Sequence, residues 1–383
     1  MAHNIAFIHA GFPGGGAERI TKDIATYLSR FGDRYRVFVL TTHIDKDLLT
    51  PAHIENITLV PIQDYSVNEL TQAITANRIN TLVQSSYPVK DISKIKKATG
   101  IKVVFACHEE PFWRRYMTEQ RGFFRKLVYK SLPKAIKPAF SYRIAVKWTA
   151  KAYRSCDAFT TLCKEYVEII RKGLKLGESH HIYAIENPEY IIEDVKYDKN
   201  KIILYSGRLD QMSKQLHKLL NIWRMVQDDM SDWKLVITGD GPDKDFLLKE
   251  AARLELKRCE FVGQQKKMQP FYDKASIVCL TSRTEGWPLC LTEAQASGCI
   301  PVAFGCTAGV IDILSDTEHG TCGFCIVPYD EHAYAETLKA IASMPKDRQY
   351  EIRKNAVKKR SLYAPEIIAE KWRILFDNLQ PNL

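Results

Sequence analysis

The 383-residue sequence contains no run of 18 or more apolar residues, so it predicts no transmembrane helix. Its first residues lead directly into an apolar stretch and lack the basic and apolar regions of a signal peptide. The ten cysteines are scattered, and several of them, such as Cys107, Cys279 and Cys290, stand inside apolar runs. That usage is typical of reduced, buried thiols. We therefore expect a cytoplasmic protein.

Signatures of metal and dinucleotide sites are also missing. The pair Cys322 and Cys325 forms a C-x-x-C with no second pair or histidine cluster nearby. Two D-x-D matches, at 45–47 and 243–245, stand in ordinary polar stretches. The glycine-rich segment 11–16 does not follow the G-x-G-x-x-G spacing of a dinucleotide fold. We expect neither a metal nor another cofactor.

What is present is an alternation of short apolar runs with helical patterns. Continuous apolar runs are typical of parallel strands that are buried on both faces. The polar stretch 187–200 separates two such series and predicts a boundary. The fold class is therefore α/β, with parallel sheets in two Rossmann-like lobes and ligands beyond the carboxyl ends of the strands. The predicted strands are Ile5–His9, Arg36–Leu40, Thr81–Gln84, Val103–Ala106, Ala158–Leu162, Ile202–Tyr205, Lys234–Thr238, Ile277–Leu280 and Pro301–Phe304.

The net charge of +10 is concentrated in one segment. Residues 111–155 hold twelve basic residues and a single acid, Glu119, with aromatic residues between them. Such a segment favours binding to an anionic membrane surface. Nucleic-acid binding and a solvated basic face are the alternatives. We expect a membrane contact and no nucleic acid.

The most informative chemistry lies in residues 285–294. Glu285 stands in a loop after an apolar strand, and Glu293 lies in a helix expected over 289–297. Pro288 suits the first helical position and Gly298 the residue past the end. The amide groups at a helix start bind anions, and neighbouring carboxylates can accept from the hydroxyls of a ribose. This combination indicates a ligand with phosphates and sugar hydroxyls.

The stretch resembles the signature of the retaining glycosyltransferases of family 4, also called group 1. The resemblance implies the GT-B fold, in which two Rossmann-like lobes flank a cleft. Residues 1–190 would form an acceptor-binding lobe, and 191–365 a nucleotide-sugar-binding lobe. A final helix at about 366–383 would pack back on the first lobe. The resemblance also implies retention of configuration without a metal.

The resemblance assigns roles to several residues. Arg208 and Lys214, after a Ser-Gly-Arg-Leu strand end, would neutralise the departing diphosphate, with Lys218 as a rival for Lys214. Amides near Leu289 and Cys290 would assist them. Glu293 would hold the ribose, and Glu285 the hydroxyls of the transferred sugar.

Further positions follow from the same resemblance. Gly15 and Gly16 would lie near the donor phosphates or the sugar, and His108 at a strand end would face the donor sugar. Gln264 is a candidate contact for the base, whereas the Gly-Asp-Gly turn at 239–241 is more often only a turn.

The sequence thus predicts a glycosyltransferase that moves a sugar from a nucleotide-diphosphate donor, which we expect to be UDP-linked, to a glycan acceptor. The acceptor would be lipid-linked, as in surface-polysaccharide or lipopolysaccharide biosynthesis at the inner face of the cell membrane. Two alternatives stay open. One is a nucleotide-sugar epimerase of GT-B fold, and the other is a non-catalytic membrane-bound partner subunit with a degenerate site.

Overall fold

The computed structural model describes residues 2–14, 16–85, 89–115, 133, 136–316, 318 and 320–380. The chain forms two compact units. The N-terminal unit comprises Met1–Pro188 and Pro365–Leu383, and the C-terminal unit comprises Glu189–Ala364. In the described part of the chain, no helix combines the length and the apolar character needed to cross a membrane.

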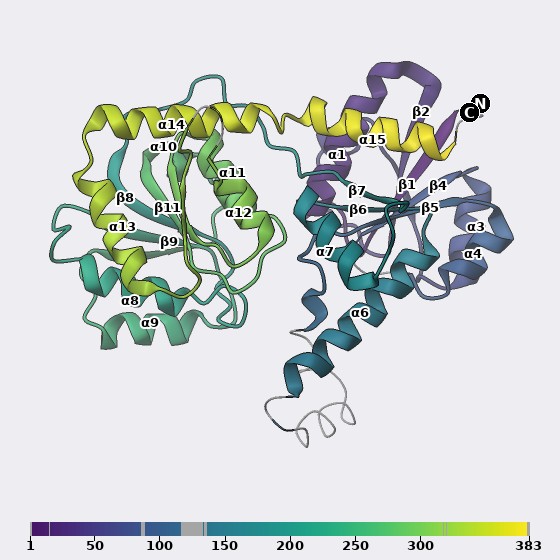
Figure 1. Ribbon diagram of the computed structural model, residues 1–383. Coiled ribbons are helices and arrows are strands. Elements are labelled where there is room, and N and C mark those ends of the chain that lie inside the picture. Colours follow the sequence, from purple (N-terminus) through teal and green to yellow (C-terminus); the bar gives the residue numbers. More distant parts are fainter. Residues whose placement is uncertain are drawn as a thin grey trace. The chain divides into compact units, whose positions relative to one another are not determined.

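A seven-stranded parallel sheet organises the N-terminal unit (Figure 1), in the order β3-β2-β1-β4-β5-β6-β7. The interior strand β1 is buried along its whole length, which explains its continuous apolar sequence. The strands are β1 (His3–His9), β2 (Tyr35–Thr41), β3 (Thr58–Pro61), β4 (Thr81–Ser85), β5 (Lys102–Ala106), β6 (Ala158–Thr161) and β7 (Ile182–Ala184).

Helices cover both faces of this sheet. On one face, buried residues of α3 and α4 pack with strand residues such as Leu82 and Phe105. On the other face lies α15, where the rings of Trp372 and Phe376 contact Phe7 of β1. The helices of the unit are α1 (Gly16–Leu28), α2 (Pro51–Ile54), α3 (Val67–Ala76), α4 (Ile92–Thr99), α6 (Lys137–Ser155), α7 (Lys164–Leu174) and α15 (Pro365–Leu379), with short 3₁₀ segments η1 (Ser29–Arg34) and η2 (Trp113–Arg115).

The C-terminal unit has a six-stranded parallel sheet in the order β10-β9-β8-β11-β12-β13. Consecutive residues of β8 enter separate cores, Ile203 with α8 and α13 and Leu204 with α10 and α11. The strands are β8 (Asn200–Ser206), β9 (Lys234–Thr238), β10 (Cys259–Gly263), β11 (Ala275–Leu280), β12 (Ile300–Phe304) and β13 (Phe324–Ile326). The helices are α8 (Leu216–Val226), α9 (Lys244–Arg253), α10 (Gln269–Lys274), α11 (Leu289–Ala296), α12 (Ala308–Leu314), α13 (Glu331–Ser343) and α14 (Lys346–Ser361).

The predicted α/β fold class with two parallel sheets is confirmed, and all nine predicted strands are present. One local prediction is wrong. Pro288 is the N-cap of α11 and not its first helical residue, since its backbone is extended with ψ 105°. In the same unit, α8 begins at Leu216, because Gln215 has a left-handed backbone with φ 48°.

Candidate active site

Glu285 and Lys214 form an ion pair in the C-terminal unit. Lys214 Nζ donates to Glu285 Oε1 at 2.6 Å, and Ser282 Oγ donates to the same oxygen at 2.6 Å. Glu285 lies in the loop that follows β11, and Lys214 lies in the turn that follows β8, the neighbouring strand. Both loops therefore begin at the carboxyl edge of the sheet, where ligands of such sheets bind.

Glu293, the second carboxylate of the motif, lies on α11. Its Oε2 accepts a hydrogen bond from the hydroxyl of Tyr272 at 2.7 Å. Tyr272 is buried on α10, and burial raises its pKa well above the usual value, so the hydroxyl keeps its proton. The neutral donor orients the Glu293 carboxylate without neutralising it.

Buried contacts hold the segments that carry the two glutamates. Trp287, which is only 4% exposed, packs its ring 5.6 Å from the ring of Tyr363. Thr292 Oγ1 donates to Glu189 Oε2 at 2.6 Å, and the amide of Glu189 donates to the carbonyl of Tyr363 at 2.8 Å. The guanidinium of Arg360 also packs on Tyr363, 4.3 Å from the centroid of its ring. The loop that carries Glu285 and the helix that carries Glu293 are thus both held by contacts that lead to Tyr363.

Arg208 is exposed just after β8. In the described part of the chain, its guanidinium has no acidic partner. The backbone at Arg208 is fixed by two hydrogen bonds. The hydroxyl of Tyr205 donates to the carbonyl oxygen of Arg208 at 3.0 Å, and the amide of Leu209 donates to the backbone carbonyl of Asp240 at 2.9 Å. Among the described residues, Arg208 therefore has no acidic partner, whereas Lys214 is paired with Glu285.

The Gly-Asp-Gly turn allows two loops to approach each other closely. Gly239 has φ +117°, and a Cβ there would collide with the carbonyl oxygen of Gly207. A Cβ on Gly241 would collide with the carbonyl of Leu209 in the same way. The backbone contact explains both glycines without a ligand.

The start of α11 presents Leu289 and Cys290 as its first two helical residues. The first amide groups of a helix have no partner within it. The amide of Leu291 already donates to the carbonyl of Pro288 at 3.0 Å. Burial raises the pKa of the Cys290 thiol to about 12, so this side chain is uncharged at neutral pH.

The two remaining candidates of this unit differ in environment. Gln264 is exposed directly after β10, at the same carboxyl edge. Lys218, the rival of Lys214, donates to Glu331 Oε1 at 2.7 Å and lies 5.5 Å from the ring of Tyr329. The structure therefore pairs Lys214, and not Lys218, with Glu285.

His108 follows β5 in the N-terminal unit. Burial lowers its pKa to about 4, against the opposing effect of a hydrogen bond with Asn187, so the ring is neutral at pH 7. Its Nδ1 is buried and has no hydrogen-bond partner in the described residues. His108 and the first turn of α1, including Ala17, line one small cavity. A neutral imidazole has one donor and one acceptor nitrogen, so the ring can form a hydrogen bond with a hydroxyl in either direction.

Two neighbours of His108 were not predicted as site residues. His9 ends β1, and its Nε2 and the Thr21 hydroxyl are 2.8 Å apart. Its Nδ1 lies 3.5 Å from Glu18 Oε1. Glu18 stands two positions after the glycine-rich segment 11–16, and His9 ends a predicted strand, so the sequence around both positions carried a signal.

The predicted glycines of the first loop divide between described and undescribed positions. Gly16 is the first residue of α1, whereas Gly15 lies outside the described residues.

Beside His108, burial raises the pKa of Glu109 to about 7 despite the nearby Arg114. Much of the basic segment 111–155 also lies outside the described residues, which include 111–115, 133 and 136–155.

The D-x-D matches have local structural roles. Asp243 Oδ2 accepts from the amide of Gln211 at 2.7 Å, and Asp45 Oδ1 accepts from the amides of Asp47 and Leu48. Among the described residues, no three His, Cys, Asp or Glu side chains gather in a way that could hold a metal ion.

Comparison with known proteins places this geometry in a family context. Residues 186–359 match the family model "Glycosyl transferases group 1". The amylovoran biosynthesis glycosyltransferase AmsD of Erwinia amylovora is 32% identical over 200 residues, which cover 50% of this chain and 52% of that protein. A Campylobacter jejuni enzyme named GalNAc-alpha-(1->4)-GalNAc-alpha-(1->3)-diNAcBac-PP-undecaprenol alpha-1,4-N-acetyl-D-galactosaminyltransferase is 27% identical over 228 residues, 58% of this chain and 60% of that protein.

These matches span about half to three fifths of the curated relatives. The fold match is more extensive. The structure of Anabaena Alr3699/HepE in complex with UDP and glucose aligns with a TM-score of 0.72 at 17% identity, covering 98% of this chain and all of that one. The GT-B architecture is therefore confirmed. The C-terminal unit thus matches the group 1 family over residues 186–359, and the fold of the whole chain is GT-B.

Proposed function

We propose that the protein is a retaining, metal-independent glycosyltransferase that moves a sugar from a UDP-linked donor to a lipid-linked glycan acceptor. The observation that carries this proposal is the set of charged groups at the carboxyl edge of the C-terminal sheet. Lys214 pairs with Glu285 there, and Glu293 is oriented by Tyr272. The biological setting would be surface-polysaccharide or lipopolysaccharide biosynthesis, which agrees with the amylovoran biosynthesis named for the Erwinia relative.

The donor diphosphate would bind the cations of this edge. Arg208 is exposed and has no acidic partner in the described residues, so it is available to a phosphate. Lys214 and the first amides of α11, at Leu289 and Cys290, supply further positive charge. These groups would stabilise the diphosphate as it leaves, which is the role a metal plays in other transferases.

The sugars of the donor would bind the two glutamates. Glu293, held by the Tyr272 hydroxyl, would accept from the ribose hydroxyls. Glu285 would accept from hydroxyls of the transferred sugar once the diphosphate shares Lys214 with it. Gln264 would contact the base. UDP is the proposed nucleotide because the aligned Anabaena protein was solved with UDP and glucose.

The N-terminal unit would bind the acceptor. Its His108 has a pKa of about 4, so the ring is neutral at pH 7 and is a weak base, which favours hydrogen bonding to the donor sugar over proton abstraction. Gly16 at the start of α1 would lie near the phosphates or the sugar, as would Gly15. Glu285 is paired with a lysine and is not assigned as a nucleophile. Retention would then follow a front-face route, in which the leaving phosphate takes the acceptor proton.

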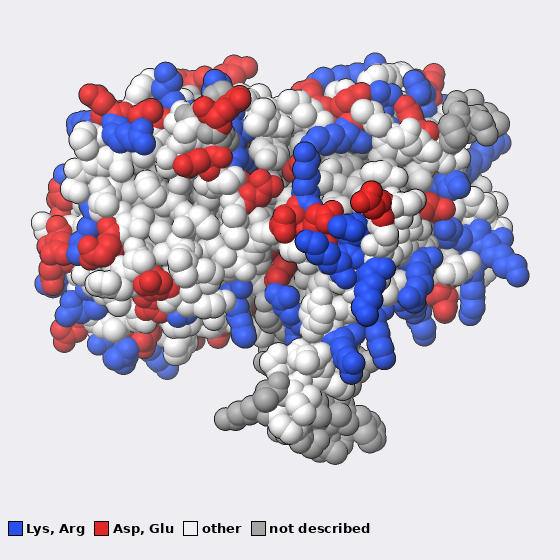
Figure 2. Space-filling model, viewed as in Figure 1, with Lys and Arg blue, Asp and Glu red and all other residues white. Residues whose placement is uncertain are grey.

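A membrane contact through residues 111–155 completes the proposal. The described part of this segment includes α6, over which Lys and Arg side chains gather in Figure 2. The acceptor named for the Campylobacter relative carries PP-undecaprenol. A lipid-linked acceptor would bring the protein to the inner face of the cell membrane.

The experiment is a turnover assay with the full chain, a panel of UDP-sugars and a synthetic polyprenyl-pyrophosphate-linked saccharide, in the presence of EDTA. We expect release of UDP and a product whose anomeric configuration, read by NMR, matches that of the donor. Inversion, or a strict metal requirement, would overturn the corresponding part of the proposal. Conversion of one UDP-sugar into another without acceptor would indicate an epimerase, and failure to bind any nucleotide would indicate a partner subunit.

A further inference from the structure

A basic groove lies on the N-terminal unit, between the start of α4 and the last turns of α6. Its volume is about 570 Å³, which is within the range of small-molecule sites. Ile92 and Trp148 contribute apolar lining, and four cations also line the groove, namely Lys90, Lys94, Lys151 and Arg154. The single acid in the lining is Asp91, so the groove has a net charge of +3.

Most of these cations lack an acidic partner. Lys94 Nζ lies 3.8 Å from Asp91 Oδ2, a long and exposed ion pair. Within the described residues, Lys90, Lys151 and Arg154 form no ion pair. Three positive charges at one groove repel each other unless an anion lies between them, so the groove is suited to an anionic ligand.

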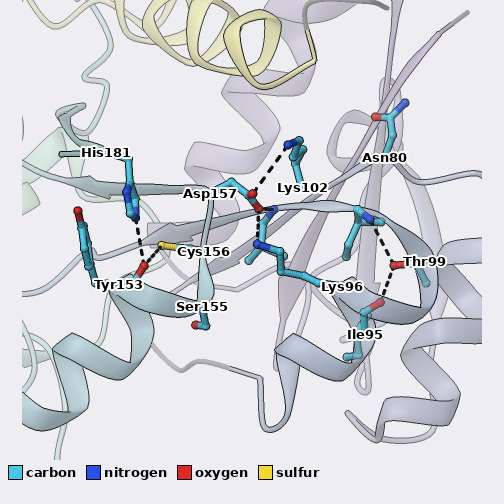
Figure 3. Close-up of polar contacts among 12 residues, drawn as sticks. Asn80, Ile95, Lys96, Thr99, Lys102, Tyr153, Ser155, Cys156, Asp157 and His181 are labelled. Carbon is cyan, nitrogen blue, oxygen red and sulfur yellow. Dashed lines mark hydrogen bonds and ion pairs between the residues drawn. The ribbon is translucent and has the colours of Figure 1, made fainter. Parts of the chain in front are cut away.

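Neighbouring lysines show the opposite arrangement. Figure 3 shows Asp157 between Lys96 of α4 and Lys102 of β5, at 2.8 and 3.9 Å. The same carboxylate accepts from the amide of Val103 at 2.8 Å, which holds it in place. Asp157 therefore pairs with two lysines that lie outside the groove, whereas three of the four groove cations have no acidic partner among the described residues.

Two further features favour a phosphate in the groove. The N-terminus of α4 borders it, and its dipole adds partial positive charge. Trp148 is fixed by an edge contact with Phe105 at 5.8 Å and by the guanidinium of Arg114 at 3.9 Å. The lining thus combines a fixed aromatic ring with four cations, and the volume of the groove leaves room for more than the phosphate itself.

We propose that this groove binds a phosphate or pyrophosphate group carried by the acceptor. The inference rests on the proposed function, because it assumes that the N-terminal unit holds the acceptor. It narrows the acceptor class to phosphate-bearing saccharides and lipids. It also assigns a role to Lys151 and Arg154 that is distinct from general attraction to a charged membrane.

The test is calorimetric titration of inorganic pyrophosphate into the full chain, with the donor site saturated by UDP. The double variant Lys151→Gln/Arg154→Gln should raise the Kd for pyrophosphate at least about tenfold, because it removes two charged partners of the anion. The matched double variant Arg143→Gln/Lys147→Gln removes the same charge from α6 outside the groove and should change this Kd less than about twofold. Lys151→Arg should retain binding, which shows that charge, and not folding, is responsible.

Several results would overturn the inference. Pyrophosphate could fail to bind the protein. Alternatively, both double variants could weaken pyrophosphate binding equally, which would mean that only the general positive charge of α6 attracts the anion. The groove variant could instead bind glucuronate or phosphatidylglycerol vesicles more weakly than the wild type while its affinity for pyrophosphate is unchanged. That result would assign the groove to another ligand. A protein that binds no UDP refutes the proposed function, but the titration without UDP would still compare the two double variants.

Discussion

Lys214 and Glu285 are joined at 2.6 Å, although 71 residues separate them in the sequence. Burial is the largest single effect and would lower the pKa of Lys214, but the charge and hydrogen bond of Glu285, together with the nearby Cys290 and Cys306, raise it above the usual value. The lysine is therefore a permanent cation at neutral pH. In the proposed reaction it would be shared between Glu285 and the departing diphosphate.

Lys214→Ala should weaken UDP binding by roughly 1.5–3 kcal/mol, or about 10- to 150-fold in Kd, since it removes a charged hydrogen-bond partner of the phosphates. Lys218→Ala is the matched control, because Lys218 is engaged with Glu331. Calorimetry with UDP measures both. Equal losses for the two variants would refute the assignment of Lys214 over Lys218.

Glu293→Ala should also weaken UDP binding by roughly 1.5–3 kcal/mol, because the ribose loses its acceptor. Tyr272→Phe removes only the hydroxyl that orients this carboxylate and should cost about 0.5–1.5 kcal/mol. The same titration with UDP measures both variants. A Tyr272→Phe protein that loses as much affinity as Glu293→Ala would contradict a merely orienting role for the hydroxyl.

Gly239→Ala should destabilise the C-terminal unit by at least about 3 kcal/mol, because the new Cβ would collide with the backbone of Gly207 at a φ of +117°. Gly263→Ala is the control, with φ +72° and open space around the position, and should cost only about 1–2 kcal/mol. Denaturant unfolding of both variants checks the difference. Similar costs would mean that the two loops separate easily.

The stability of the N-terminal unit should fall in acid through His3. Burial lowers its pKa to about 4, the nearby Asp377 opposing this effect, whereas an unfolded chain would have the usual value near 6.5. Above pH 6.5 the ring is neutral in both the folded and the unfolded state, so it does not change the free energy of unfolding. As the pH falls from 6.5 to 4, the unfolded state takes up the proton first, so up to about 3 kcal/mol of unfolding free energy is lost.

His3→Asn should reduce this acid-dependent loss. Denaturant unfolding of both proteins at pH 7.5 and 5 provides the comparison. A variant whose stability falls with pH as steeply as the wild type would show that His3 does not contribute.

The sequence was a good guide to the central strands and a poor one to the edges. The four strands that it did not predict, β3, β7, β10 and β13, are the edge strands of the two sheets. They are partly exposed, as in the pattern of β3, and three of them have only three or four residues, so they lack the continuous apolar run that reveals a buried strand. Edge strands of parallel sheets therefore lack this signal.

The site shows a similar division. Motif residues such as Glu285 and Glu293 could be identified because they stand close together in a recognisable stretch. The hydrogen bond between Thr292 and Glu189 joins positions 103 residues apart, and no local pattern predicts it. Such partners follow only from the packing of the folded unit.

The most direct measurement is binding of UDP, GDP, ADP and CMP to the full chain by thermal shift, without added metal. A ligand that binds only the folded state raises the melting temperature as its concentration exceeds Kd. We expect a shift with UDP that exceeds the shifts with the other nucleotides and that Lys214→Ala diminishes. No shift with any of the four, or an undiminished shift in that variant, would contradict the donor site proposed at the carboxyl edge of the C-terminal sheet.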